Sequence, residues 1–145
     1  MPSYLLTAYL NTSKEVDILN ATHDVKRAHR ESKIVNGLLT VYLPGSCAGV
    51  KVLENEPEVQ KKFLNLISSF TPNSTEARPK RRSNTGHDAA HLRAALLSNS
   101  VGIPIKDGKL LLGPWQEVVL YDFDDRIGRR DFHILVMGDE AEQKK

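Results

Sequence analysis

The tetrapeptide at 106–109, Lys-Asp-Gly-Lys, is the local signal that most restricts how this chain can fold. Asp-Gly at the two central positions favours a tight turn in which both residues have positive φ, the geometry that joins two antiparallel strands. Apolar, strand-like stretches flank the turn at 100–105 and 109–123. The sequence therefore predicts a β-hairpin here, followed by another strand at 129–138.

Strand and helix patterns alternate in the preceding part of the chain. Residues 3–12 mix apolar and polar side chains like a half-buried strand, whereas residues 14–32 space their apolar side chains closer to a helical pattern. The stretches 33–44 and 48–55 predict two strands, which pair as a hairpin through the Pro-Gly-Ser sequence at 44–46.

Two further helices are predicted, at 56–70 and 87–97. The face of the first that we expect to meet the core has apolar residues at helical spacing: Val59, Phe63, Leu66, Ile67 and Phe70. Between the two helices, residues 71–86 are rich in Pro, Ser, Asn, Thr and bases, which predicts a flexible basic loop. Strands segregated around a few helices favour an α+β fold, in a single domain over 1–145.

Composition narrows the classes of protein that fit. The 145 residues are 40% hydrophobic, enough for one core, and 20 Lys and Arg against 18 Asp and Glu lack the one-sided charge of a nucleic-acid-coating protein. The lone Cys47 excludes an internal disulfide. Without a secretion-signal pattern or an apolar run long enough to cross a bilayer, we expect a cytoplasmic protein with no membrane partner.

A long ordered set of residues resembles a known family. It comprises His91, Arg93, Leu97, Ser100, Pro104, Gly108, Gly113, Trp115, Gln116, Arg129 and Arg130. This run is similar to the pattern of the YjbQ-type family, whose members are often named secondary thiamine-phosphate synthases. Upstream, residues 41–56 resemble the family's strand and its Asn-Glu-Asn stretch, with Glu54 and Asn55 in place. The resemblance extends through most of the chain.

The resemblance implies both a fold and an activity. The fold is an antiparallel β-sandwich with about three helices, in which the sheets of three subunits pack about a threefold axis as a homotrimer. The activity joins a pyrimidine-methyl pyrophosphate to a thiazole phosphate with loss of pyrophosphate, so the ligand is a small phosphorylated molecule. The chain departs from the family where Gly45 replaces a histidine, Ala89 an aspartate and Glu117 a glycine. A site built from several histidines cannot be carried over intact.

Three residues in family positions are catalytic candidates. His91 matches the family histidine and is expected to act as a metal ligand or a general acid/base. Arg93 stands in place of the family lysine and can clamp developing negative charge. Glu54 is expected beside the histidine site, where a carboxylate can orient an imidazole or exchange protons with it; it can equally be a hydrogen-bonding loop acid.

Three more residues are phosphate-binding candidates. Arg129 and Arg130 match the family's terminal basic run, and guanidinium groups suit phosphate oxygens. Strand alternation sends them to opposite faces, so at most one is expected to face a given pocket. Gln116 follows Trp115 in a family signature; the alternative is a core or interface tryptophan with a hydrogen-bonding neighbour.

A metal site is the third kind of expectation. His87 and His91 are four residues apart, a spacing that lets two imidazoles on one helix face bind one ion. Zinc needs a third ligand, and Cys47 is the candidate, because in a strand it points to the same side as position 45. Alternatively, Cys47 is a small buried hydrophobe and His87 is solvent-exposed. The cofactor expectation is zinc or another divalent ion, with magnesium accompanying a phosphorylated substrate.

Two functions remain open from the sequence. One is a thiamine-phosphate synthase-type enzyme with a remodelled site and weak activity. The other is a relative that keeps the fold and a ligand pocket but has lost catalysis, which the missing histidine at Gly45 favours.

Overall fold

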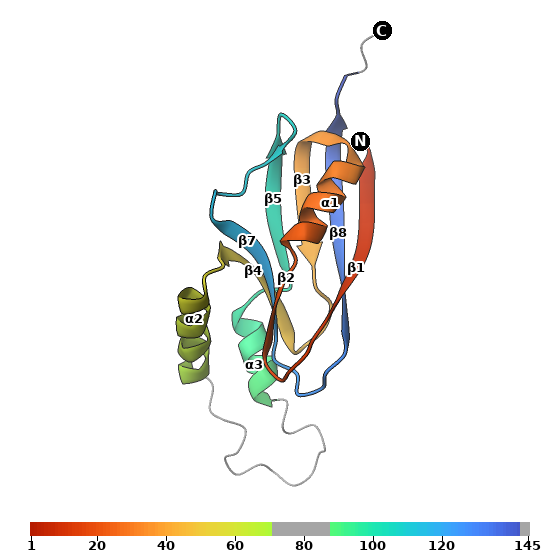
Figure 1. The fold of residues 1–145 in the computed structure, drawn as a ribbon. Coiled ribbons are helices and arrows are strands. Elements are labelled where there is room, and N and C mark those ends of the chain that lie inside the picture. The colour runs from red at the N-terminus through yellow and green to blue at the C-terminus, as the bar shows by residue number, and fades with distance from the viewer. Residues whose placement is uncertain (71–87, 143–145) are drawn as a thin grey trace.

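The computed structural model describes residues 1–70 and 88–142, which form two antiparallel sheets and three helices (Figure 1). A five-stranded sheet has the order β1-β8-β3-β5-β6, and a three-stranded sheet has the order β2-β7-β4. In chain order the elements are β1 (Ser3–Asn11), β2 (Asp17–Asn20), α1 (Thr22–Ser32), β3 (Ile34–Tyr42), β4 (Ala48–Glu54), α2 (Pro57–Phe70), α3 (Asp88–Leu96), β5 (Ser100–Lys106), β6 (Lys109–Leu110), β7 (Gln116–Asp122) and β8 (Arg129–Glu140). The expected α+β fold is confirmed.

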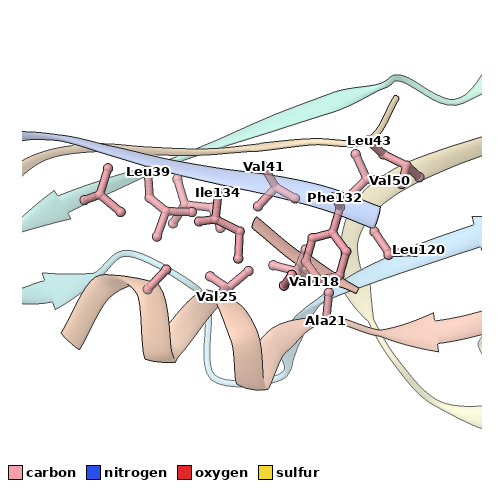
Figure 2. Packing of buried hydrophobic residues seen from close by; sticks show 14 of the residues in the cluster. Ala21, Val25, Leu39, Val41, Leu43, Val50, Val118, Leu120, Phe132 and Ile134 are labelled. Carbon is pink, nitrogen blue, oxygen red and sulfur yellow. The ribbon is translucent and has the colours of Figure 1, made fainter. Parts of the chain in front are cut away.

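The main core lies between the large sheet on one side and α1 with the small sheet on the other. Figure 2 shows Ala21 and Val25 of the α1 segment facing Phe132 and Ile134 of β8. All four side chains are fully buried. Alternate residues of β8 point into this core, so the strand's period of two fixes its register against β1 and β3.

β7 belongs to two cores at once. Val118 and Leu120 point into the main core, whereas Val119, Tyr121 and Phe123 point to a second core that contains residues of α2 and α3. Because successive side chains of a strand point to opposite faces, a strand covered on both faces must be apolar throughout. The run from Val118 to Phe123 meets this demand except at Asp122, which has an ionic partner.

The hairpin predicted at 106–109 is present between β5 and β6. Lys106 pairs with Lys109 across the turn, and the central Asp107 and Gly108 have φ of 51° and 78°. A two-residue hairpin turn of this type requires a positive φ at both central residues. The stretch 109–123, expected as one strand, is divided into β6 and β7, because Gly113 and Pro114 interrupt it.

The expected helix at 14–32 is wrong over its first part. Residues 17–20 form β2, where Ile18 pairs with Tyr121 of β7. The Asp17 carboxylate accepts hydrogen bonds from the backbone and the hydroxyl of Ser13, which closes a turn before the strand. Sheet pairing therefore outweighs the helical spacing of the apolar residues, and α1 begins only at Thr22.

The expected hairpin between 33–44 and 48–55 is also wrong. Both stretches are strands, but β3 pairs with β5 and β8 in the large sheet while β4 pairs with β7 in the small one. The Pro-Gly-Ser sequence carries the chain from one sheet to the other. Turn-forming residues predict a change of direction but do not identify the strand's partner.

The inward face of helix α2 is only partly the one expected. Ile67 is buried and Phe63 packs against the second core, as predicted, whereas Val59, Leu66 and Phe70 are exposed. Gln60, which was not expected to face inward, is buried. The Gln60 amide is satisfied there because its Nε2 donates to Asn55 and its Oε1 accepts from the Tyr121 hydroxyl at 2.5 Å. An amide with hydrogen-bond partners is buried at little cost, so the positions of apolar residues alone do not predict which face of α2 is buried. In the described part of the chain no helix has the length and apolar character to cross a membrane.

Two glycines in adjacent strands provide a stability test. A Cβ on Gly37 would lie 2.0 Å from the carbonyl oxygen of Met137, and one on Gly138 would lie 2.0 Å from that of Asn36. Since the clashing atoms are backbone, side-chain motion cannot relieve them. We expect Gly37→Ala to lower the free energy of unfolding by about 3 kcal/mol or more.

The matched control is Gly102→Ala in β5, where the new Cβ meets only the end of the Leu38 side chain at 3.4 Å. Its loss is expected to stay below about 1 kcal/mol. Urea unfolding of the three proteins measures both values, and equal losses for Gly37→Ala and Gly102→Ala would contradict the prediction.

Candidate functional site

The loop at 44–47, between β3 and β4, is the centre of the candidate site. The Asn99 side chain holds it in place, because its Nδ2 donates to the carbonyls of Leu43 and Gly45 at 2.8 and 3.2 Å. Gly45 has a φ of 126°, in the region that favours glycine, and a Cβ built there meets no atom within 4 Å. The loop therefore borders open space on the side where Gly45 lies.

A pocket of about 380 Å³ lies between this loop and α3. Its lining comprises Gly45, Ser46, Ala48, His91, Ala94, Ala95 and Asn99. His91, Ala94 and Ala95 are spaced i, i+3 and i+4, so they share one face of α3. The alanine side chains are small and carry no functional group, so the exposed His91 imidazole is the main functional group of this face.

A second pocket, of about 270 Å³, lies on the other side of the same loop. It shares Gly45, Ser46 and Ala48 with the first and is otherwise lined by Pro44, Cys47, Asp122, Asp124, Arg126 and Arg130. The Arg130 Nε donates to Asp122 Oδ2 at 2.6 Å, and its Nη2 donates to Oδ1 at 3.4 Å. This two-point ion pair stabilises an aspartate that is otherwise buried at the end of β7.

Asp124 is the second buried carboxylate of this pocket. Burial alone would raise its pKa, but hydrogen bonds from the backbone N–H and the guanidinium of Arg126 outweigh burial and lower the pKa to about 2. Cys47 responds in the opposite direction. Burial raises the pKa of its thiol, and the negative charge of Asp124 raises it further. The site therefore favours an ionised Asp124 beside a protonated thiol.

The expected metal ligands are only partly described. Cys47 lines one pocket and His91 the other, on the two sides of the shared loop, while His87 lies outside the described residues. Over residues 1–70 and 88–142, no three or more His, Cys, Asp or Glu side chains are grouped as a metal site. Cys47 is half-buried and also packs against the second core. The three-ligand zinc site stays a prediction that depends on His87.

Comparison with known proteins identifies the chain's relatives. The family model described as "UPF0047 protein YjbQ-like" matches residues 7–139. The chain belongs to this UPF0047 family. A UPF0047 protein of Methanocaldococcus jannaschii is 32% identical over 132 residues, covering 90% of this chain and 92% of the relative. The UPF0047 protein YugU of Bacillus subtilis is 29% identical over 135 residues, covering 92% and 99%.

Solved structures agree with this UPF0047 assignment. A YbjQ-like protein of unknown function from Sulfolobus solfataricus superposes with a TM-score of 0.81 at 25% identity, covering 94% of this chain and 98% of the relative. A YjbQ/UPF0047 family protein from Clostridium acetobutylicum gives 0.79 at 28% identity, covering 91% and 99%. The resemblance read from the sequence is confirmed at the level of family and fold.

In this UPF0047 chain, Glu54 and Gln116 lie away from the loop. They pair with each other across β4 and β7, at the end of the small sheet opposite to Ala48 and Asp122. At the usual strand rise the two ends are about 20 Å apart. Within one chain, the expectation that Glu54 lies beside the histidine and cysteine is therefore wrong. Gln116 accepts a hydrogen bond from the backbone N–H of Gly113 at 2.8 Å, as a hydrogen-bonding neighbour of Trp115 would.

The three arginine candidates also separate. Arg129 is exposed, bonds Asp131 at 2.6 Å and lies over the Tyr9 ring at 4.2 Å. Arg130 turns to the other face and into the pocket beside Cys47, as the strand alternation predicts. Arg93 lies two residues after His91, about 200° around the helix axis, and is not among the residues that line the His91 pocket.

Sequence reasoning missed three residues of the pocket beside Cys47, namely Asp122, Asp124 and Arg126. Their signal was present as the run Asp-Phe-Asp-Asp-Arg at the end of a buried strand. Acids that end an apolar strand are buried with it, so they need cationic partners such as the nearby arginines.

The lowered pKa of Asp124 predicts how stability depends on pH. Its folded pKa of about 2 lies below the ordinary 3.8, so its contribution is complete above about pH 4 and is lost as the pH falls towards 2. We expect Asp124→Asn to lower the free energy of unfolding at pH 7 by about 1–3 kcal/mol. The gap to the wild type should narrow between pH 4 and pH 3.

Urea unfolding at pH 7, 4 and 3 measures this gap. Asp131→Asn is the control, because its ion pair with Arg129 is exposed and is worth less than about 1 kcal/mol. A gap that stays constant across the three pH values would refute the assignment of the lowered pKa to Asp124.

Proposed function

We propose that this UPF0047 protein binds a small phosphorylated molecule around the loop at 44–47 and has a weak thiamine-phosphate synthase-type activity. The observation that supports this most is the shared loop, which separates a pocket bearing His91 from one bearing Arg126 and Arg130. A ligand that spans the loop would meet an imidazole on one side and guanidinium groups on the other, which suits a reaction that expels pyrophosphate.

Each group has a distinct part in the proposed reaction. His91 is exposed in its pocket and can transfer a proton at a ligand bound there. The Arg126 guanidinium also donates to Asp124, but its side chain is 78% exposed, so it can meet the negative charge of a departing pyrophosphate while keeping that partner. Arg130 already donates to Asp122 and to the Arg126 carbonyl, so its part is to hold the pocket wall in shape.

A second candidate function is ligand binding without catalysis. Gly45 favours it, because this position lacks the family histidine and also has a backbone φ of 126° that side chains other than glycine rarely adopt. Restoring the imidazole would therefore require the loop to change its backbone conformation. A pocket adapted in this way fits a cytoplasmic binding protein as well as a weak enzyme.

Zinc or another divalent ion is proposed with Cys47, His87 and His91 as its ligands. The donor types suit zinc, but the described part of the chain places Cys47 and His91 on different sides of the loop, and the raised pKa of the thiol opposes the thiolate form. Magnesium would enter with the phosphorylated substrate.

The outer face of the large sheet supports the proposal of a homotrimer. On the side away from the main core it carries exposed large hydrophobic residues, namely Leu5, Tyr9, Leu38, Tyr42 and Met137. A wide apolar sheet face of this kind marks a surface that associates with another protein. We expect light scattering to give three times the 16.2 kDa mass of the chain, unchanged by dilution. A monomer at every concentration would disprove the trimer.

Activity separates the two functions. We expect purified protein, free of host synthase, to form thiamine phosphate from its two phosphorylated precursors, and His91→Ala to lower that rate by ~100-fold. Lys61→Gln, on exposed α2, is the control and should retain the wild-type rate. Metal analysis of the same preparations, with and without Cys47→Ala, tests the ligand set. No product from the wild type would reject catalysis and leave the binding function.

A further inference from the structure

Helix α1 carries bases along the side that faces the β5–β6 hairpin. Lys26, His29, Arg30 and Lys33 are spaced i, i+3, i+4 and i+7, which places them on one side of a helix that is continued by its C-cap. With Ile34, Val35 and Gly108 they line an open pocket of about 430 Å³, which we name the α1 pocket. None of the described residues that line it is acidic.

The acids of α1 are turned away from these bases. Asp24 pairs with Arg27 at 3.3 Å, and Glu31 accepts a hydrogen bond from the Tyr4 hydroxyl of β1. Among the described residues, Lys26 and Arg30 take part in no ion pair. Lys26 also lines a neighbouring pocket that contains Glu56 and Glu117. Like charges at i, i+4 repel each other, so the positive field is strongest towards Arg30 and Lys33, at the end of the helix away from these glutamates.

The geometry at the helix end adds to this observation. Lys33 is the C-cap and has a φ of 60°, a left-handed conformation for which glycine is the usual residue. His29 is held at the pocket edge, with its Nε2 donating to the Ile34 carbonyl at 3.2 Å. Position 33 is thus a lysine although glycine would be less strained there, and the His29 imidazole beside it is held by its hydrogen bond.

Helix stabilisation explains only part of this arrangement. Bases in the last turn of a helix interact favourably with its partial negative charge, which accounts for His29 and Arg30. It does not account for Lys26, one turn earlier, or for Lys33 in a strained conformation. The permanent charges of Lys26, Arg30 and Lys33 also exceed the roughly half charge of the helix end that opposes an anion.

The α1 pocket is remote from the loop at 44–47. It lies at the beginning of β3, whereas that loop follows the end of the same strand, which at the usual rise is about 27 Å away. Figure 1 shows α1 ending near the β5–β6 hairpin, with α3 at the opposite end of the molecule. A ligand in the α1 pocket therefore does not touch His91.

We propose that the α1 pocket binds the di- or triphosphate group of a small molecule. Its volume is within the usual range of ligand pockets, and it combines a guanidinium that can bond two phosphate oxygens with two ammonium groups that act as point charges. Several closely spaced cations favour a polyphosphate over a single phosphate. This site is independent of the function proposed for the His91 pocket.

Calorimetric titration of the full chain with tripolyphosphate and with inorganic phosphate, at low salt, tests the proposal. We expect tripolyphosphate to bind more tightly than phosphate, and Arg30→Gln, Lys33→Gly to weaken its binding by about tenfold or more. Glycine adopts the left-handed conformation at position 33 without strain, so this double variant should fold. Lys61→Gln, Lys62→Gln on exposed α2 removes the same charge elsewhere and should leave Kd unchanged.

Four results would overturn the proposal. The first is that tripolyphosphate does not bind the wild type, and the second is that both double variants weaken its binding equally. The third is that Arg30→Gln, Lys33→Gly lowers Tm without weakening tripolyphosphate binding. The fourth is that a single-stranded RNA oligonucleotide binds more tightly than tripolyphosphate. Binding that persists in His91→Ala while product formation is lost would separate this site from the enzyme function.

Discussion

The structure depends on one strand, β7, being buried on both faces. Its even-numbered apolar residues complete the core under the large sheet, and its odd-numbered ones form the second core with α2 and α3. The strand also pairs with β2 on one edge and β4 on the other, so its backbone groups are satisfied by neighbours. Because Asp122 ends this strand, its ion pair with Arg130 joins the two-sided core to the candidate pocket beside Cys47.

Local sequence signals predicted where the strands and helices lie better than they predicted which strands pair with each other. Asp107-Gly108 predicted its hairpin because the turn is determined by the two residues in it. Residues 17–20 were assigned to a helix because their apolar spacing is ambiguous in a short run, and only pairing with β7 makes them a strand. The partner of β3 could not be predicted, since strands far apart in sequence pair through the whole fold.

The candidate site shows the same limit. Family resemblance led to His91, and strand alternation led to Arg130, and the structure places both residues at pockets that share one loop. Glu54 was placed wrongly because a position in a motif does not give the distance along a strand. Asp124 and Arg126 were missed because their importance comes from burial and mutual hydrogen bonds, which the sequence does not show.

The strand order of the large sheet also has a consequence for how the chain is made. β8 lies between β1 and β3, although it is the final strand in chain order. While the chain is being synthesised, β1 and one edge of β3 must wait for a partner until more than 130 residues have left the ribosome, as the pairing of Ser3 with Met137 shows. Such long-range pairing makes folding slow and leaves unpaired strand edges exposed in the nascent chain. Assembly of the large sheet is therefore completed only when β8 inserts between two strands that are synthesised long before it.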